Sequence, residues 1–566
     1  MSQSSSPGAP VSFGADSTHD HAPHSRAPMS HRQVLEALSG LMMGMFVAII
    51  SSTVVSTSLP RIIADLGGGQ SAYTWVVTST LLATTVSTPL WGKFADLFDR
   101  KLLLQLSLIV FVFGSALAGQ SHNAGMLIGF RVVQGLGAGG LTALGQVVLA
   151  DIISPRERGR YMGLLGAVMS VGTVGGPLLG GLITDSIGWR WNFYVGVPIA
   201  VIAILLIQKT LKLPKLPRRV VDIDYLGAAL IASGVSLLLI WVSLAGSQFA
   251  WASTSSYLMV LGSIVLLALA VFAEMRAAEP IIPLTLFRNR TVVMAVIASV
   301  AVGVAMFGTS VFLSQYMQLA RGKSPTESGL LTIPMVFGTL ISSIGGGQLI
   351  SRTGIWKPFM VAGSIIMTIG IAAMGTIRSD TSFVLVSLYM VALGLGVGLV
   401  MQNLVLVVQN VVSVRQLGAA SSTISFFRSL GGSIGVSVMG AVLASRVSGY
   451  ISDGLANLGV GQGGAASSGQ IPKLSELPEP VRLVVEHAYG HGVGDVFMIA
   501  VPMGIITCIA VALLPNRSLG TRSAAEQMDE ELRVATSVLR SPAPDDAKVP
   551  QAPHGEAKAP HSMVRS

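Results

Sequence analysis

The chain alternates between long apolar runs and short polar connectors. A helix needs about 20 predominantly apolar residues to cross the hydrocarbon core of a bilayer. Runs of this length recur from one end of the sequence to the other, so we expect fourteen membrane-spanning helices. They cover residues 36–58, 73–95, 102–120, 125–149, 161–184, 190–209, 224–245, 256–275, 292–318, 327–350, 357–377, 382–408, 417–445 and 494–514. The predicted fold class is an all-α polytopic membrane protein.

Composition supports this assignment. Hydrophobic residues make up 51% of the chain and charged residues 11%, whereas soluble domains carry about 25% charged residues. The net charge of +9 would suggest nucleic acid as a partner of a soluble protein. Here the cations gather in alternate connectors, which follows the positive-inside rule. We therefore expect a plasma-membrane protein with the lipid bilayer as its partner, no nucleic acid, and both termini in the cytoplasm.

The connectors and tails divide the chain into five parts. Residues 1–33 are rich in Ser, Pro and His and lack the apolar core of a signal peptide, so they are predicted to be a disordered tail. The segment 475–490 fits either an amphipathic helix or a solvated loop. The expected parts are the tail 1–33, a six-helix bundle 34–210, two extra central helices 211–290, a second six-helix bundle 291–515 with an outer connector 446–493, and a C-terminal tail 516–566.

The motif GKFADLFDRK at 92–101 follows the second predicted span. Gly92 allows two helices to approach closely. Asp96 can pair with Arg100 or Lys101, or face the positive N-terminus of a neighbouring helix. Such a contact suits a joint that forms and breaks between conformations. An ordinary interfacial turn that obeys the positive-inside rule would explain the same residues.

The motif FRVVQGLGAGG at 130–140 places Arg131, Gln134 and Gly135 on one face of the fourth span. An intramembrane charge is a functional hypothesis by default. The alternative is that Arg131 extends toward the interface.

The motif VGTVGGPLLGG at 171–181 repeats glycine at every fourth position of the fifth span, at Gly172, Gly176 and Gly180, and ends on Gly181. This repeat gives a smooth face for a partner helix. Pro177 removes a backbone donor and is expected to bend the helix. The face suits a rocking interface or static close packing, and composition alone does not separate the two.

Together the three motifs resemble those of the major facilitator superfamily. The fourteen spans and the fifth-span Gly-Pro motif are similar to its drug:proton antiporter branch of the EmrB/QacA type. The resemblance covers roughly 36–515 and implies two pseudo-symmetric six-helix bundles around a cavity that opens alternately to each side. It also implies proton-driven efflux of drugs or amphipathic metabolites. We expect a monomer without a cofactor. The second half keeps a weaker copy of the first motif at 346–358, which has Arg352 and Lys357 but no counterpart of Asp96.

The first span departs from the family pattern. In this branch an Asp usually stands where Ser51 is found, and Ser56 replaces the usual Asn. Serine does not exchange a proton near neutral pH. No other acid lies near mid-membrane in the predicted spans, whereas Arg131 and Arg428 do lie deep. We therefore expect a preference for neutral, zwitterionic or acidic amphiphiles. The alternative for Arg428 is that it bonds only to the backbone of a broken or neighbouring helix.

The predicted cavity lining collects polar side chains within apolar helices, because such residues usually face the interior of a helix bundle. Some of them are expected only to tie helices together. The candidates are Ser51, Thr53, Ser56, Arg131, Gln134, Gln315, Tyr316, Gln318, Gln402, Asn403 and Arg428.

An enzyme is not expected. The sequence shows no metal-ligand spacing, nucleophile elbow or phosphate loop, and GLGAGG at 135–140 lies inside an apolar run without a preceding strand. Two alternatives to drug efflux stay open, namely a lipid or glycolipid translocator of the same fold and a membrane receptor that has lost transport.

Overall fold

The computed structural model describes residues 31–521, except 68–69, 212–223, 246–247, 324 and 458–476, together with 526–527. Within these residues the regular structure is helical apart from an isolated β-bridge between Ala245 and Phe249. The predicted tails therefore lie largely outside the described residues. The helices are α1 His31–Asp65, α2 Gln70–Leu97, α3 Arg100–Gly119, α4 Ala124–Ile152, α5 Pro155–Ser186, α6 Trp191–Tyr194, α7 Gly196–Thr210, α8 Tyr225–Leu244, α9 Thr254–Arg276, η1 Leu284–Arg288, α10 Arg290–Gln315, η2 Tyr316–Ala320, α11 Pro325–Leu331, α12 Ile333–Thr353, α13 Lys357–Met374, α14 Phe383–Gln409, η3 Val414–Gln416, α15 Leu417–Asn457 and α16 Glu479–Ala512.

A helix covers most of each predicted span. Among the described residues, 12 helical segments are both long and apolar enough to cross a membrane. The predicted spans that fall outside this set correspond to α2 and α5, which contain 28 and 32 residues. Frequent Ser and Thr in α2, and Gly in α5, lower their hydropathy, although both helices are long enough to span at about 1.5 Å per residue.

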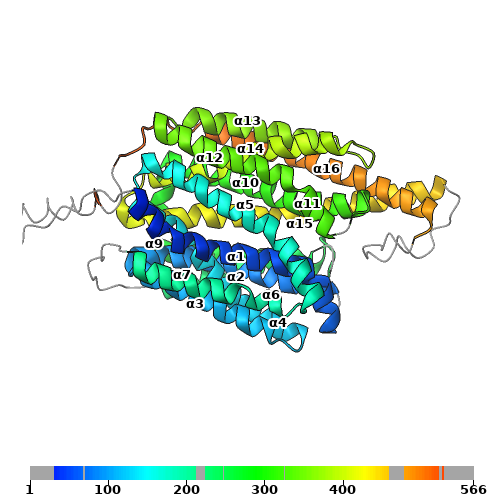
Figure 1. The fold of residues 1–566 in the computed structure, drawn as a ribbon, viewed down its shortest axis with the longest axis horizontal. Coiled ribbons are helices and arrows are strands. Elements are labelled where there is room, and N and C mark those ends of the chain that lie inside the picture. Colours follow the sequence, from blue (N-terminus) through cyan, green and yellow to red (C-terminus); the bar gives the residue numbers. More distant parts are fainter. Residues whose placement is uncertain are drawn as a thin grey trace, which may run out of the picture.

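Two bundles of similar design form the body of the protein (Figure 1). In the first half, α4 packs along α2 and α3, and α1 packs along α5 and α7. The second half repeats this scheme, because α14 packs along α12 and α13, and α10 packs along α15 and α16. The separate apolar cores of the two halves agree with this division. Pseudo-symmetry makes the α2/α15 contact between the halves equivalent to the α5/α12 contact.

The inserted helices α8 and α9 form a hairpin beside the α2/α15 contact. One apolar cluster joins Val86 of α2, Ile231 and Val235 of α8, and Phe426 of α15. Helix α9 packs along α8, and much of its remaining surface is exposed and apolar, as at Leu258. Such a surface is typical of a helix that faces lipid.

The described chain begins and ends at the same end of the bundle, on the left in Figure 1. We call this end, which carries Lys93, Arg100, Arg158 and Arg415, the basic end, and the opposite one the far end. An even number of crossings brings the chain back to its starting side.

The predicted outer connector 446–493 is wrong in its extent. Helix α15 continues to Asn457 and α16 already begins at Glu479, so both helices extend past the rest of the bundle at the far end (Figure 1). Buried Leu455 and Val485 and a hydrogen bond from the Tyr450 hydroxyl to Asp495, 2.7 Å long, stabilise this extension. The amphipathic segment near 475–490 is therefore, from Glu479 on, the first part of α16 and not a separate surface helix.

Candidate functional site

Asp96 at the end of α2 forms a direct contact between the two halves. Its carboxylate accepts the backbone N–H groups of Gly418 and Ala419, at 2.8 and 2.9 Å, in the first turn of α15. The side chain is only 4% exposed. A carboxylate that binds the free N–H groups of a helix N-terminus also meets the positive end of the helix dipole. The structure thus pairs Asp96 with a helix N-terminus of the other half.

Glycines allow the two helices to approach this closely. A Cβ atom on Gly92 would overlap the Ser422 side chain, and one on Gly418 would overlap the carbonyl oxygen of Gly92. The backbones of α2 and α15 therefore touch at this point. A larger residue on either side would push the halves apart.

Arg100 and Lys101 have different roles, although the sequence grouped them. Arg100 is buried, pairs with Asp151 of α4 and lies 3.7 Å from the Asp96 carboxylate. Lys101 instead donates to the carbonyl oxygen of Gln208, 2.8 Å away on α7. Arg100 therefore belongs to the inter-half site, whereas Lys101 fastens helices within the first half.

A second polar contact between the halves was missed by the sequence analysis. The Arg158 guanidinium, 2% exposed, donates to Gln409 Oε1 at 2.5 Å and to the carbonyl oxygens of Ala150 and Ile153. Gln409 in turn donates to the Gln146 carbonyl oxygen across the halves. Nothing in the sequence marks Gln409 as a partner of an arginine 251 residues away.

The hydrogen bonds that join described residues of the two halves gather toward the basic end. Besides the Asp96 and Arg158 contacts, Gln146 Nε2 lies 3.5 Å from Gln402 Oε1. A small apolar cluster of Ala150, Val414 and Leu417 lies at the same level. The structure therefore shows the halves joined at the basic end.

The fourth-span motif splits into a polar pair and a packing residue. Arg131, 5% exposed, donates to Gln134 Oε1 at 2.9 Å, and its Nε lies 3.5 Å from the Val76 carbonyl oxygen. Gly135 instead faces α2, where a Cβ atom would lie 2.6 Å from the Thr80 carbonyl oxygen. Gly135 serves helix packing, while Arg131 is held without a carboxylate partner among the described residues.

The glycine face of α5 packs against α1 of the same half. The Thr53 hydroxyl donates to the Gly172 carbonyl oxygen at 3.2 Å, and a Cβ atom on Gly176 would overlap Thr53. The Gly180 carbonyl oxygen similarly accepts from Ser58. Helix α5 approaches α12 of the other half near Gly166. The repeat Gly172–Gly176–Gly180 is thus a contact within one half. Gly181 is partly buried, and the side chain of Pro177 lies outside the described residues.

The predicted first-span cavity residues are not brought together. Ser51 is buried, its oxygen has no hydrogen-bond partner among the described residues, and it faces Gly196 at the start of α7. Thr53 faces α5. The expectation that Ser51 lines a central cavity is wrong, because α7 covers the face of α1 on which it lies. The side chain of Ser56 lies outside the described residues.

The second-half candidates other than Arg428 lie in two places, at the far end and near the contact between the halves. Tyr316 is fully buried at the far end, where its hydroxyl donates to the Arg378 carbonyl oxygen, and Gln318 bonds to Ser314. Gln402 lies at the inter-half contact, as described above, and Asn403 bonds to its own helix at Leu399. The buried side-chain amide oxygen of Gln315, Oε1, has no hydrogen-bond partner among the described residues.

Arg428 is the deepest cation of the second half. It lies about 16 Å along α15 from its start and is 7% exposed. One terminal nitrogen reaches Ser425 Oγ at 3.4 Å, while the other has no hydrogen-bond partner among the described residues. A buried cation in this state is costly. The described residues therefore leave one Arg428 nitrogen unpaired in the interior of the second half.

Sequence comparison agrees with the two-bundle architecture. The model of the Major Facilitator Superfamily matches residues 41–436. The chain belongs to the major facilitator superfamily. Members of this superfamily are transporters, so the chain is a membrane transporter and not an enzyme.

Several relatives in this superfamily are similar over most of their length. The chain is 30% identical over 494 residues to "Multidrug resistance protein 3" of Bacillus subtilis, covering 85% of this chain and 95% of that one. It is 35% identical over 418 residues to "Multidrug transporter protein MdtP" of the same organism, covering 74% and 77%. An uncharacterized MFS-type transporter of Mycobacterium tuberculosis is 39% identical over 481 residues, covering 84% and 69%.

Solved structures of the superfamily share the fold. The proton:xylose symporter XylE has a TM-score of 0.59 at 14% identity, covering 88% of this chain and 99% of that one. The human organic anion transporter MFSD10 has a TM-score of 0.58 at 14% identity, covering 84% and 99%. At this identity the likeness establishes the architecture.

Proposed function

We propose that this protein exports drugs or amphipathic metabolites by alternating access. The observation that carries the proposal is the Asp96 contact with the first turn of α15. It joins the two halves through charge and hydrogen bonds, without a covalent link, so it can form and break. The names of the two Bacillus subtilis relatives, a multidrug resistance protein and a multidrug transporter, support multidrug export.

In this proposal the basic end faces the cytoplasm of the cell and the transporter acts as a monomer. The cation distribution supports this orientation through the positive-inside rule. Counting α2 and α5 as spans gives fourteen crossings, as in the drug:proton antiporter branch, with both termini in the cytoplasm. Protease digestion of a tag at either terminus in sealed vesicles tests the orientation.

The proton gradient is the proposed energy source, as the family resemblance implies. Within the described helices the buried carboxylates of Asp96, Asp151 and Glu274 lie toward the basic end. Proteoliposomes with an imposed pH gradient provide the test. We expect solute uptake to rise when the gradient is applied and to fall when an ionophore collapses it. If solute flux does not depend on the pH gradient, the proposal of proton antiport fails, whereas the proposal of export still stands.

Arg131 and Arg428 support a substrate that is neutral, zwitterionic or acidic. A solute anion at Arg428 would supply the missing partner of its free nitrogen. We expect Arg428→Gln to lower transport of an acidic amphiphile roughly tenfold, because a charge-assisted hydrogen bond in a dry site is lost. A neutral analogue should be affected little. Arg446→Gln, on the same helix but 58% exposed, is the matched control.

If both analogues lose transport equally after Arg428→Gln, the arginine has a structural role and the charge preference fails. Introducing an acid into the first span by Ser51→Asp is a poorer test, because the Ser51 side chain is buried against α7.

A further inference from the structure

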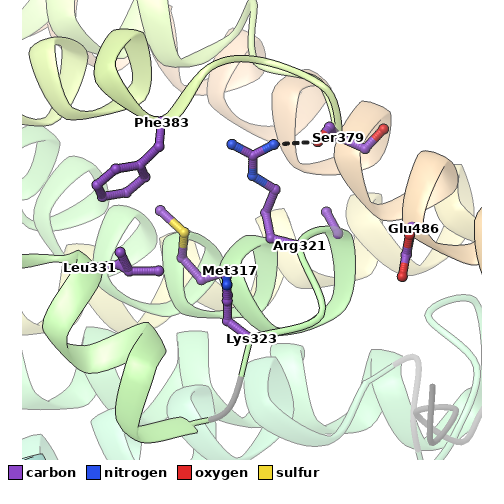
Figure 2. Close-up of a pocket in the computed structure, with 8 residues that line it drawn as sticks. Met317, Arg321, Lys323, Leu331, Ser379, Phe383 and Glu486 are labelled. Carbon is purple, nitrogen blue, oxygen red and sulfur yellow. Dashed lines mark hydrogen bonds between the residues drawn. The ribbon is translucent and has the colours of Figure 1, made fainter. Parts of the chain in front are cut away.

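A pocket at the far end, lined by residues of the second half, combines cationic and apolar walls. Its volume is about 480 Å³. It opens where α10 passes into the π-helix η2, after which Gly322, with a φ of +63°, turns the chain. Short π-helical segments occur frequently at functional sites. The pocket is lined by Met317, Ala320, Arg321, Lys323, Leu331, Ser379, Phe383 and Glu486 (Figure 2).

Arg321 is held rigidly at one wall. Its terminal nitrogens donate to the carbonyl oxygens of Ser379 and Thr381, both at 2.6 Å, in the loop between α13 and α14. Figure 2 shows the bond to Ser379. The guanidinium also lies 5.8 Å from the ring centre of Tyr316. Carbonyl oxygens satisfy these N–H groups but carry no formal charge. Arg321 is thus a preorganised cation whose charge the loop backbone does not neutralise.

The lining carries two cations, Arg321 and Lys323, and one carboxylate, Glu486, so its net charge is +1. The exposed Lys323 ammonium forms no hydrogen bond or ion pair within the described part of the chain. Glu486, the acid of the lining, lies 3.6 Å from Arg482 and shares its charge with that residue. Asp380, in the nearby loop, does not line the pocket. An anion entering here meets two cations.

The opposite wall is apolar and borders the lipid-facing surface. Figure 2 shows Leu331 and Phe383 on the side away from Glu486, with Met317 between them and the arginine. Leu330, next to Leu331 in the chain, is 40% exposed, and Val384, next to Phe383, is 80% exposed. Exposed large apolar side chains on membrane helices face acyl chains. The pocket therefore has one wall suited to a charged headgroup and another suited to hydrocarbon.

We propose that this pocket binds an anionic phospholipid from the bilayer leaflet at the far end. Its phosphate would lie between Arg321 and Lys323, and an acyl chain would cover Leu331 and Phe383. Basic pockets between membrane helices bind anionic headgroups in this way. A bilayer lipid fits better than an exported solute because the apolar wall adjoins the lipid-facing surface. The site is independent of the solute that is transported.

Native mass spectrometry of the full chain in detergent tests the assignment with phosphatidylglycerol and with phosphatidylcholine of equal acyl length. We expect one phosphatidylglycerol to be retained in preference to phosphatidylcholine. Lys323→Gln and Phe383→Ala should each weaken its apparent affinity roughly fivefold, through loss of a charged contact and of buried apolar area. The matched controls are Lys209→Gln, an exposed lysine at the basic end, and Val384→Ala, next to Phe383 but facing outward.

Three results would overturn the proposal. Equal retention of phosphatidylcholine, or equal affinities of Lys323→Gln and Lys209→Gln, would show general attraction to detergent or lipid instead of a site. Glycerol 1-phosphate that displaces the lipid at similar concentrations would indicate a free-anion site. All variants are compared as monodisperse, folded protein.

Discussion

The two equivalent contacts between the halves differ in how they are made. At α2/α15, Asp96 binds a helix N-terminus, glycines bring the backbones together, and α8 covers the outside. At α5/α12, Gly166 packs near Ser343, and the polar bond from Arg156 to the Arg352 carbonyl oxygen is 3.5 Å long. The weaker second copy of the motif, which lacks an acid, accounts for this. We call the α2/α15 contact, which Asp96, Gly92 and Gly418 form, the latch; it is charged and α8 covers it. The α5/α12 contact is formed by close packing.

This difference indicates which of the two contacts stabilises the conformation in which the halves meet at the basic end. A group that binds one conformation better than another shifts the equilibrium toward it. Helix α8 packs on both α2 and α15, so it stabilises the state in which these helices touch. A lipid translocator would need lateral passage between the halves, and the hairpin covers one of the two contacts that offer it.

The largest expected effect comes from removing the charge of the latch. Asp96→Asn should lower export at least about tenfold, because the helix N-terminus and Arg100 lose a buried carboxylate. Efflux of a fluorescent substrate at matched expression measures it. Glu157→Gln, an exposed acid in the first turn of α5, is the control. Wild-type efflux from Asp96→Asn would refute the latch.

The next effect comes from the close approach of the backbones. In Gly418→Ala the added Cβ would overlap the Gly92 carbonyl oxygen, so the basic end should stay open and efflux should fall severalfold. Spin labels at Phe98 and Arg415, in a chain whose one cysteine is replaced by Cys508→Ser, report the separation. Gly175→Ala has open space around it and should change nothing. An unchanged label distance in Gly418→Ala would contradict the steric argument.

A smaller effect is expected where the hairpin meets the latch. Lys93 of α2 pairs with Glu279, after α9, at 2.7 Å, and Glu274 fixes this loop by accepting the N–H groups of Ile281 and Ile282. Glu279 is partly exposed, so Lys93→Gln or Glu279→Gln should shift the open–closed equilibrium only about two- to fivefold. The double variant Lys93→Gln with Glu279→Gln should shift the equilibrium no further than either single variant, because both remove the same ion pair. Additive shifts, measured with the same spin labels, would show that the pair does not stabilise the closed state.

The smallest effect is expected at the other contact. Arg156→Gln removes a long, exposed hydrogen bond, so efflux should stay within about twofold of wild type. A loss as large as that of Asp96→Asn would show that both contacts are latches and would remove the asymmetry.

The helices were predictable because each rests on a local pattern of apolar residues. Apolar runs locate spans, and an acid at a helix end anticipated the contact of Asp96 with a helix N-terminus. The partner helix was not predictable, because it lies 322 residues away. Ser51 was misplaced for a related reason, since family position says which residue is unusual but not which neighbour covers it. Arg158 and Gln409 form a contact that only the packed halves create.

The far-end extension of α15 and α16 gives the second half a rigid arm. At about 1.5 Å per residue, the 41 residues of α15 measure roughly 60 Å, about twice the hydrocarbon thickness of a bilayer. Because Tyr450 and Asp495 tie the two helices together, a small rotation of the half becomes a larger displacement at the tip. A fluorophore or antibody fragment attached at the tip would report the rotation of the second half during transport, without touching the solute path.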